Sequence, residues 1–178
     1  MILKIVQVGD PVLRAGTTEI DPSRIHAPEL QGLIEMMRAT MIDAPGVGLA
    51  APQVGVPLRL TVIEDRADVI AMMPPELVAQ RDRRPVPFHV LINPKLTIVD
   101  PTPVSFAEGC LSVTGFAAQV PRARAVRVEA LDHKGAPHVI EATGWYARIL
   151  QHEIDHLDGC LYVDRMDTRT FFATDPDS

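Results

Sequence analysis

The segment that most constrains this chain is QHEIDHLDG at residues 151–159, in which His152 and His156 stand four positions apart. On a helix, side chains at positions i and i+4 share one face, about 40° apart around the axis. Glu153 points about 60° beyond His156, so the three side chains lie on one side. Two imidazoles beside a carboxylate can hold a metal ion and supply a general base. The segment therefore predicts a helix that carries a metal site.

The surroundings of the histidines predict that this helix is largely buried. Apolar side chains cover most of its surface: Trp145, Tyr146, Ile149, Leu150, Ile154 and Leu157. A narrow polar stripe lies on the opposite side, formed by Arg148, Gln151, Asp155 and Asp158. The alternative to a metal site is a pair of core histidines beside a surface carboxylate. Glu153 falls on the apolar side, where an ionised carboxylate is costly without a partner, and this favours the metal site.

The rest of the chain predicts an α+β fold with antiparallel strands. A helix begins at Pro28, because proline suits a first helical position and apolar residues follow at helical spacing. Alternating or apolar runs predict strands at 58–62, 89–92, 96–99, 126–130 and 138–142. The last two form a hairpin around Lys134-Gly135. Asn93-Pro94 and residues 100–103 interrupt the predicted strands.

The length and composition fit a single domain over residues 1–178, with 47% hydrophobic and 22% charged residues. Residues 1–27 are expected to form a partly irregular arm. Residues 66–87 predict a surface insertion with a short helix after Pro75, in which the charged run 81–84 forms a solvated face. Residues 168–178 are expected to be a tail.

The charge and the apolar pattern exclude several classes of protein. A net charge of −6 argues against nucleic-acid binding, which depends on clustered basic residues. No apolar run approaches the roughly 20 residues of a membrane span. The start of the chain lacks the features of a signal peptide, so the cytoplasm is the expected compartment, with a processed organellar form as the alternative.

A cysteine completes the predicted site. If Cys110, in EGCLS at 108–112, joins His152 and His156, three ligands leave a fourth tetrahedral position for water, as in catalytic sites. A metal ion lowers the pKa of its water, and Glu153 can take the remaining proton. Both features indicate hydrolysis of a carbonyl compound. Alone, Cys110 could equally be an inert buried thiol. Likewise, GVGLAAPQ at 46–53 alone predicts a plain turn between helix and strand.

Together, GVGLAAPQ at 46–53, EGCLS at 108–112 and QHEIDH at 151–156 resemble the motifs of the peptide deformylase family. The resemblance extends over residues 43 to 171, and SVTGF and DRMDTRTF resemble the branch that includes mitochondrial and plastid enzymes. It implies antiparallel β-sheets packed around a central, buried metal-binding helix. It also implies a metal-dependent hydrolase that removes the formyl group from N-formylmethionyl nascent peptides and releases formate.

The resemblance assigns roles to particular residues. The implied metal ligands are Cys110, His152 and His156. The implied ion is ferrous iron, with zinc, nickel or cobalt as substitutes, whereas spacing alone would favour zinc. Metal-bound water would attack the formyl carbonyl, with Glu153 as general base and then acid. The side-chain amide of Gln53 and the backbone N–H of Leu111 would stabilise the oxyanion.

The resemblance also implies how the substrate binds. Its extended backbone would pair with main-chain groups near Val47, Gly48 and Gly109, as in strand addition. Ile149 projects between the two histidine directions and is the candidate wall of the methionine pocket. The expected partners are nascent peptides and, transiently, the ribosome, although the chain shows no basic C-terminal helix for docking.

Two other classes fit the sequence less well. A zinc endopeptidase with an HExxH motif takes its third ligand from a downstream Glu or His, and none follows His156. A protein whose metal merely holds the fold would close the site with a fourth ligand. Only Cys160 could supply that ligand, near the expected end of the helix.

Overall fold

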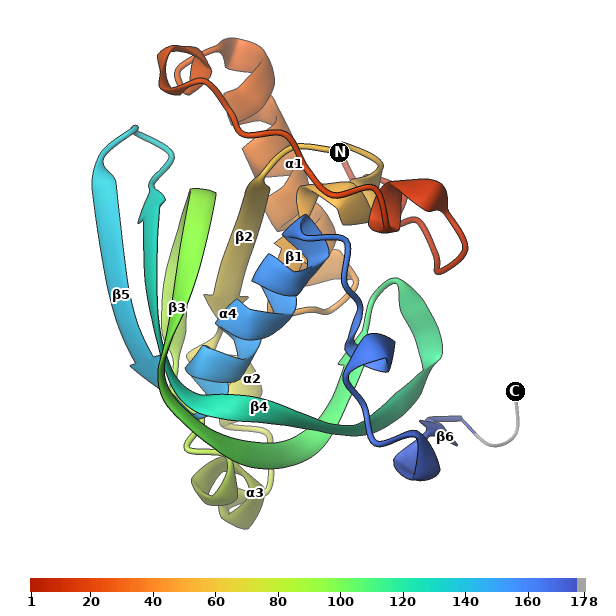
Figure 1. Cartoon of the computed structure of the whole chain (residues 1–178). Coiled ribbons are helices and arrows are strands. Elements are labelled where there is room, and N and C mark those ends of the chain that lie inside the picture. Colours follow the sequence, from red (N-terminus) through yellow and green to blue (C-terminus); the bar gives the residue numbers. More distant parts are fainter. Residues whose placement is uncertain (176–178) are drawn as a thin grey trace.

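The computed structural model describes residues 1–175 and places helix α4 (Gly144–Leu157), which carries both histidines, inside the curve of an antiparallel sheet (Figure 1). In these residues, six strands form one sheet in the order β1-β2-β3-β4-β5, with β6 paired to β4. The strands are β1 (Gly48–Ala50), β2 (Leu60–Asp65), β3 (Val86–Cys110), β4 (Val113–Leu131), β5 (Pro137–Thr143) and β6 (Phe172–Ala173). The predicted α+β class, with antiparallel strands around a buried helix, is confirmed.

Helix α1 (Pro28–Asp43) forms where the sequence predicts it. Its buried side chains follow helical spacing and pack on β1 and β2: Leu30, Ile34, Met37 and Met41. Pro28 occupies the first turn, where a missing N–H costs nothing, and the helix ends before Pro45. The shorter helices are α2 (Ala67–Ile70), α3 (Pro75–Gln80), η1 (Pro11–Leu13), η2 (Pro22–Arg24), η3 (Ala51–Val54), η4 (Tyr162–Asp164) and η5 (Thr168–Thr170). Within residues 1–175, no helix has the length and apolarity of a membrane span.

The predicted strand breaks turn out to be bulges in one long strand. β3 runs through Asn93-Pro94 and through residues 100–103, and its register against β4 shifts at both places. Asn93 has a positive φ of 52°, which asparagine tolerates, and its side-chain amide exchanges hydrogen bonds with the backbone of Ile20. The bulges bend β3, which with β4 curves around α4 (Figure 1).

The polar stripe of α4 is buried, apart from Asp158. Arg148 and Asp155 form ion pairs with side chains of β3 and β4, and Gln151 hydrogen-bonds the backbone of Ala123. The apolar side of the helix packs on β3, β4 and β5 in a second cluster of buried side chains. α4 is therefore enclosed on both sides, more completely than the amphipathic pattern predicts.

The segment 66–87 contains α2 and α3, in agreement with the predicted helix after Pro75. The charged run 81–84 is not a solvated face throughout, so that expectation is wrong in part. The Arg83 side chain is only 9% exposed and forms a bidentate pair with the buried Asp65, whereas Arg84 is exposed. A carboxylate at the end of β2 needs a cation, and the segment supplies it.

The N-terminal arm connects two of the motif segments. Val6 N–H donates to the carbonyl of Gln53, and Val8 N–H donates to the carbonyl of Ser112. The Gln7 side chain donates to the carbonyl of Leu111 and accepts from Thr114. The arm thus fixes the loop after β3 against η3. Residues 176–178 of the predicted tail lie outside the described residues.

Candidate metal centre

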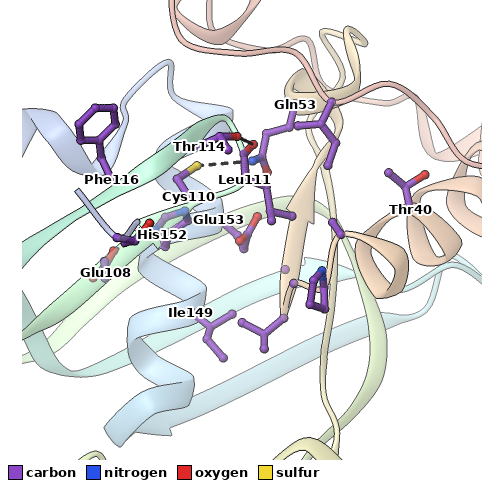
Figure 2. A pocket seen from close by; sticks show the side chains of 18 of the residues that line it. Thr40, Gln53, Glu108, Cys110, Leu111, Thr114, Phe116, Ile149, His152 and Glu153 are labelled. Carbon is purple, nitrogen blue, oxygen red and sulfur yellow. Dashed lines mark hydrogen bonds and ion pairs between the residues drawn. The ribbon is translucent and has the colours of Figure 1, made fainter. Parts of the chain in front are cut away.

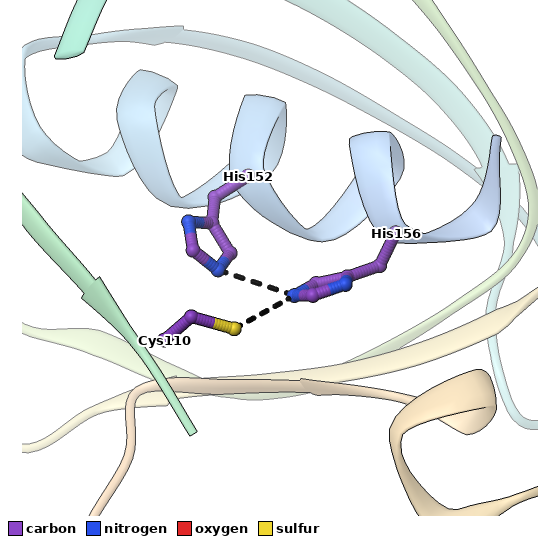
Figure 3. A group of neighbouring side chains, drawn as sticks. All are labelled: Cys110, His152 and His156. Carbon is purple, nitrogen blue, oxygen red and sulfur yellow. Dashed lines mark hydrogen bonds between the residues drawn. The ribbon is translucent and has the colours of Figure 1, made fainter. Parts of the chain in front are cut away.

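The three predicted ligands meet in the structure, although they come from two distant elements. Cys110 ends β3, whereas His152 and His156 extend from successive turns of α4 (Figure 3). The Cys110 Sγ lies 3.3 Å from His156 Nε2, which lies 3.2 Å from His152 Nε2. One potential ligand atom from each residue lies within 4.8 Å of the others. The group is therefore compact enough to surround a single ion.

These separations fit a bound transition metal. With a metal–nitrogen distance of about 2.0 Å and tetrahedral angles, two imidazole nitrogens lie about 3.3 Å apart. Two imidazole nitrogens and a cysteine sulfur all carry lone pairs. A cation between them makes such a close approach favourable. The Cys160 Sγ contacts the carbonyl of Leu161, and Cys160 is not part of the group. A metal here would have three protein ligands and an open position.

Glu108 orients His152 from behind. A Glu108 carboxylate oxygen lies 2.9 Å from His152 Nδ1, so the ring can donate there and direct the lone pair of Nε2 towards the group. Burial would raise the pKa of Glu108, but hydrogen bonds from Arg122 and His152 hold it well below its usual range. Arg148 donates to the same carboxylate. Glu108 therefore remains an anion that can fix the imidazole.

Glu153 lies beside the ligands and is buried. Its carboxylate packs against Gly48, where an added Cβ would lie 2.3 Å from Oε1, so only glycine fits there. Thr61 Oγ1 donates to the other oxygen at 3.3 Å. Burial raises the pKa of Glu153 to about 7, although the charge of His152 and the Thr61 hydrogen bond oppose the shift. A carboxyl with this pKa can both accept and donate a proton near neutrality.

Gln53 is fixed with its amide nitrogen towards Cys110. Its Oε1 accepts from the Ala50 N–H at 2.9 Å, and this bond orients the side chain. Its Nε2 donates to Ser112 Oγ at 3.2 Å and lies 3.6 Å from the Cys110 Sγ. Next to it, the carbonyl of Leu111 is held by Gln7. The structure thus places a side-chain donor and the Leu111 backbone beside the predicted metal site.

A cavity of about 770 Å³ opens onto this group. Its walls include the predicted residues Val47, Gly48, Gln53, Gly109, Cys110, Leu111, Ile149, His152 and Glu153. Figure 2 shows Ile149 one turn along α4 from the ligands, beside the cavity. His156 lies outside the lining and is deeply buried. The cavity therefore combines a polar centre with an apolar wall.

Several lining residues have no role in the sequence analysis. The Arg81 guanidinium lies over the Trp145 ring, 4.3 Å from its centroid, and both residues line the cavity. Phe116 also lines the cavity. Thr61 contacts Glu153 from β2, although its alternation with Leu60 and Val62 in the sequence predicts an exposed position; β2 is in fact buried on both faces. The contact between Arg81 and Trp145 joins segments far apart in the chain, so no local sequence pattern predicts it.

The chain is similar to known proteins over most of its length. The model of the family described as Polypeptide deformylase matches residues 2–171. Peptide deformylase 1A, chloroplastic, of Solanum lycopersicum is 49% identical over 94% of this chain and 60% of its own length. Peptide deformylase 3 of Streptomyces avermitilis is 50% identical over 97% of this chain and 75% of its own length. The chain thus spans less than two thirds of the tomato relative.

Solved structures show the same likeness. A Met-Ala-Ser-bound crystal structure of a class I type b peptide deformylase from Acinetobacter baumannii superimposes with a TM-score of 0.82 at 30% identity. That match covers 93% of this chain and 99% of the other. The family-model match over residues 2–171 includes the elements that carry Cys110, His152, His156 and Glu153.

Proposed function

Because the chain belongs to the polypeptide deformylase family, we propose that it hydrolyses the formyl amide of N-formylmethionyl nascent peptides and releases formate. One observation carries the proposal: Cys110, His152 and His156 converge beside the buried carboxylate of Glu153 on the wall of an open cavity. Three ligands with an open position, next to a proton carrier, are typical of metal-assisted hydrolysis.

The metal ligands in this proposal are Cys110, His152 and His156, and the proposed ion is ferrous iron. Zinc, nickel and cobalt are proposed substitutes, since imidazole and thiolate bind all of these ions. When bound, the ion supplies a polarised carbonyl and a water activated near neutral pH. Glu108 holds His152 in the orientation that this binding requires.

The chain's own residues handle the proton and the developing charge. Glu153 takes a proton from the attacking water at its carboxylate and delivers it to the leaving methionine nitrogen. The Gln53 amide and the Leu111 backbone N–H donate to the oxygen of the formyl carbonyl as its charge grows. Gln53 suits this role because Ala50 and Ser112 already fix its orientation.

The open edge of β1 provides a place for the substrate backbone. β1 is the last strand on its side of the sheet and pairs only with β2 among the described strands. An extended peptide can hydrogen-bond along Val47 and Gly48 on one side and near Gly109 on the other. The methionine side chain would then contact Ile149, whose buried side chain forms an apolar wall.

The partners, the domain organisation and the compartment are also proposals. The partners are formylated nascent peptides, with transient proximity to the ribosome, and residues 1–178 act as one domain. We retain the cytoplasm as the proposed compartment, with a processed organellar form as the alternative, because relatives include a chloroplastic enzyme.

Formate release tests the proposed function directly. Protein reconstituted with nickel, or with ferrous iron under anaerobic conditions, should release formate from formyl-Met-Ala and leave Met-Ala unchanged. Exclusion of oxygen matters because an iron–thiolate site is prone to oxidation. A folded, metal-loaded sample that releases no formate would contradict the proposal, and peptide-cleavage assays would then identify an endopeptidase.

Replacing Cys110 tests the metal site. Cys110→Ser should weaken metal binding by at least roughly tenfold and alter the preference among metals, because a soft thiolate is replaced by a hydroxyl. Cys160→Ser is the matched control and should leave metal content unchanged, since its sulfur contacts the Leu161 carbonyl and lies outside the ligand group. Metal titration of both variants measures the difference. An unaltered affinity in Cys110→Ser would remove Cys110 from the ligand set.

A further inference from the structure

Phe116, which lines the cavity, stacks with Phe171 in an exposed aromatic pair that has no part in the proposed chemistry. The rings of Phe116 and Phe171 stack with centroids 4.9 Å apart and planes 11° from parallel. Each residue is 42% exposed, although the chain has only five phenylalanines. Figure 2 shows Phe116 on the opposite side of Cys110 and His152 from Thr40. Exposed aromatic surface next to a binding cavity is typical of a surface that a bound ligand covers.

The aromatic pair is rigidly held, because the C-terminal segment is bound to the edge of β4. β6 pairs antiparallel with it, placing Ala173 opposite Phe116 and Phe172 opposite Ala117. Thr174 N–H donates to the carbonyl of Gly115 and extends this pairing. Earlier in the segment, Asp167 N–H donates to Gln119, whose own N–H donates to Thr170 Oγ1. The platform is thus fixed before any ligand arrives.

Strand geometry separates the neighbouring phenylalanines into two environments. Cross-strand partners share a face of a sheet, whereas successive residues point to opposite faces. Phe171 therefore lies on the face of Ala173 and Phe116, and Phe172 lies on the face of Ala117. Phe172 is 48% exposed, about as much as Phe171, but it is not part of the stack. The chain thus contains its own control residue.

The register of the sheet places the stack within reach of a bound peptide. Gly109, where the substrate backbone is proposed to pair, lies opposite Ala117, the neighbour of Phe116. Adjacent strands are about 4.8 Å apart, and an extended peptide advances about 3.3 Å per residue. Residues three and four of a substrate would therefore lie about 10 and about 13 Å from the formyl group. Phe116 and Thr174 both line the same cavity as Cys110 and His152.

We propose that the Phe116–Phe171 stack is a specificity subsite that binds an apolar or aromatic side chain at the third or fourth residue of the formylated peptide. The proposal rests on the proposed function and deepens it. An aromatic side chain on this platform would lose water and gain ring contacts, which favours such peptides about 3- to 10-fold in kcat/KM. Because all formylated nascent chains begin with methionine, this preference would distinguish them by their third or fourth residue.

Paired substrates test the subsite. The peptides are formyl-Met-Ala-Phe-Ala and formyl-Met-Ala-Ala-Phe, each compared with the same peptide carrying serine in place of phenylalanine. The measured quantity is the ratio of kcat/KM for the phenylalanine and serine forms, in one protein preparation. This ratio is independent of the fraction of folded enzyme, so partial instability of a variant does not affect it.

The wild-type ratio should be about 3 to 10 at one of the two positions. Phe171→Ser should reduce it to about 1, and Phe172→Ser should leave it unchanged. A wild-type ratio near 1 at both positions, or an equal loss in both variants, would overturn the subsite. Release of formate from formyl-Met-Ala, which is too short to reach the stack, reports separately on the proposed function.

Discussion

Glu153→Gln should retain the bound metal and lose turnover by about 10²- to 10⁴-fold, the usual contribution of a general acid–base group. The substitution keeps the shape of the side chain, so it preserves the packing against Gly48 and the contact with Thr61. What it removes is a carboxyl whose pKa burial raises to about 7. The amide cannot accept a proton from water or deliver one to the leaving amine.

The measurement is kcat for formate release at a fixed, verified metal content. Glu153→Ala should behave similarly, because the three metal ligands remain in place. Glu141→Gln, on the exposed edge of the β4–β5 hairpin, is the matched control and should keep wild-type turnover. Near-normal turnover in metal-loaded Glu153→Gln would remove Glu153 from the proton transfer.

The residues of the candidate site could be predicted because their chemistry is local and specific. The i, i+4 histidines and Glu153 define one helix face, and α4 forms there. Cys110 and Gln53 came from the resemblance and from donor chemistry, and the structure brings both to the same cavity. Helix α1 and the β4–β5 hairpin followed from apolar periodicity, which burial alone imposes.

The supports of the site could not be predicted, because they depend on contacts between distant residues. Gln7 holds the Leu111 carbonyl across 104 positions, and no local pattern marks that partner. The polar stripe of α4 has the spacing of a solvent-exposed face, yet Arg148 and Asp155 are paired inside the sheet. Likewise, Asn93-Pro94 is a typical break, but tertiary contacts with Ile20 convert it into a bulge.

The most consequential of these unpredicted supports is Arg122. Its side chain is 3% exposed and joins the carboxylates of Glu108 and Asp155, donating twice to Glu108 at 2.9 Å. Arg148 and Arg165 complete the cluster. Because Glu108 also orients His152, the cluster connects the stability of the sheet to the geometry of the ligand group.

Arg122→Met should therefore lower the free energy of unfolding by about 3–5 kcal/mol, the cost of leaving buried charges without a partner. Arg127→Met is the matched control on the same strand. Arg127 pairs with Glu129 and Glu141 at the surface, so its loss should cost under about 1 kcal/mol. Urea unfolding in the presence of a chelator measures both values without a contribution from metal binding.

A second measurement separates the two roles of Arg122. If it also fixes the Glu108–His152 contact, the folded Arg122→Met protein should bind metal about 10- to 100-fold more weakly, as expected when an outer-shell partner is lost. Arg127→Met should bind metal normally. Equal destabilisation in both variants would mean that Arg148 and Arg165 alone neutralise the buried carboxylates. Lost stability with unchanged metal affinity would confine Arg122 to the fold, leaving Arg148 to hold Glu108 against His152.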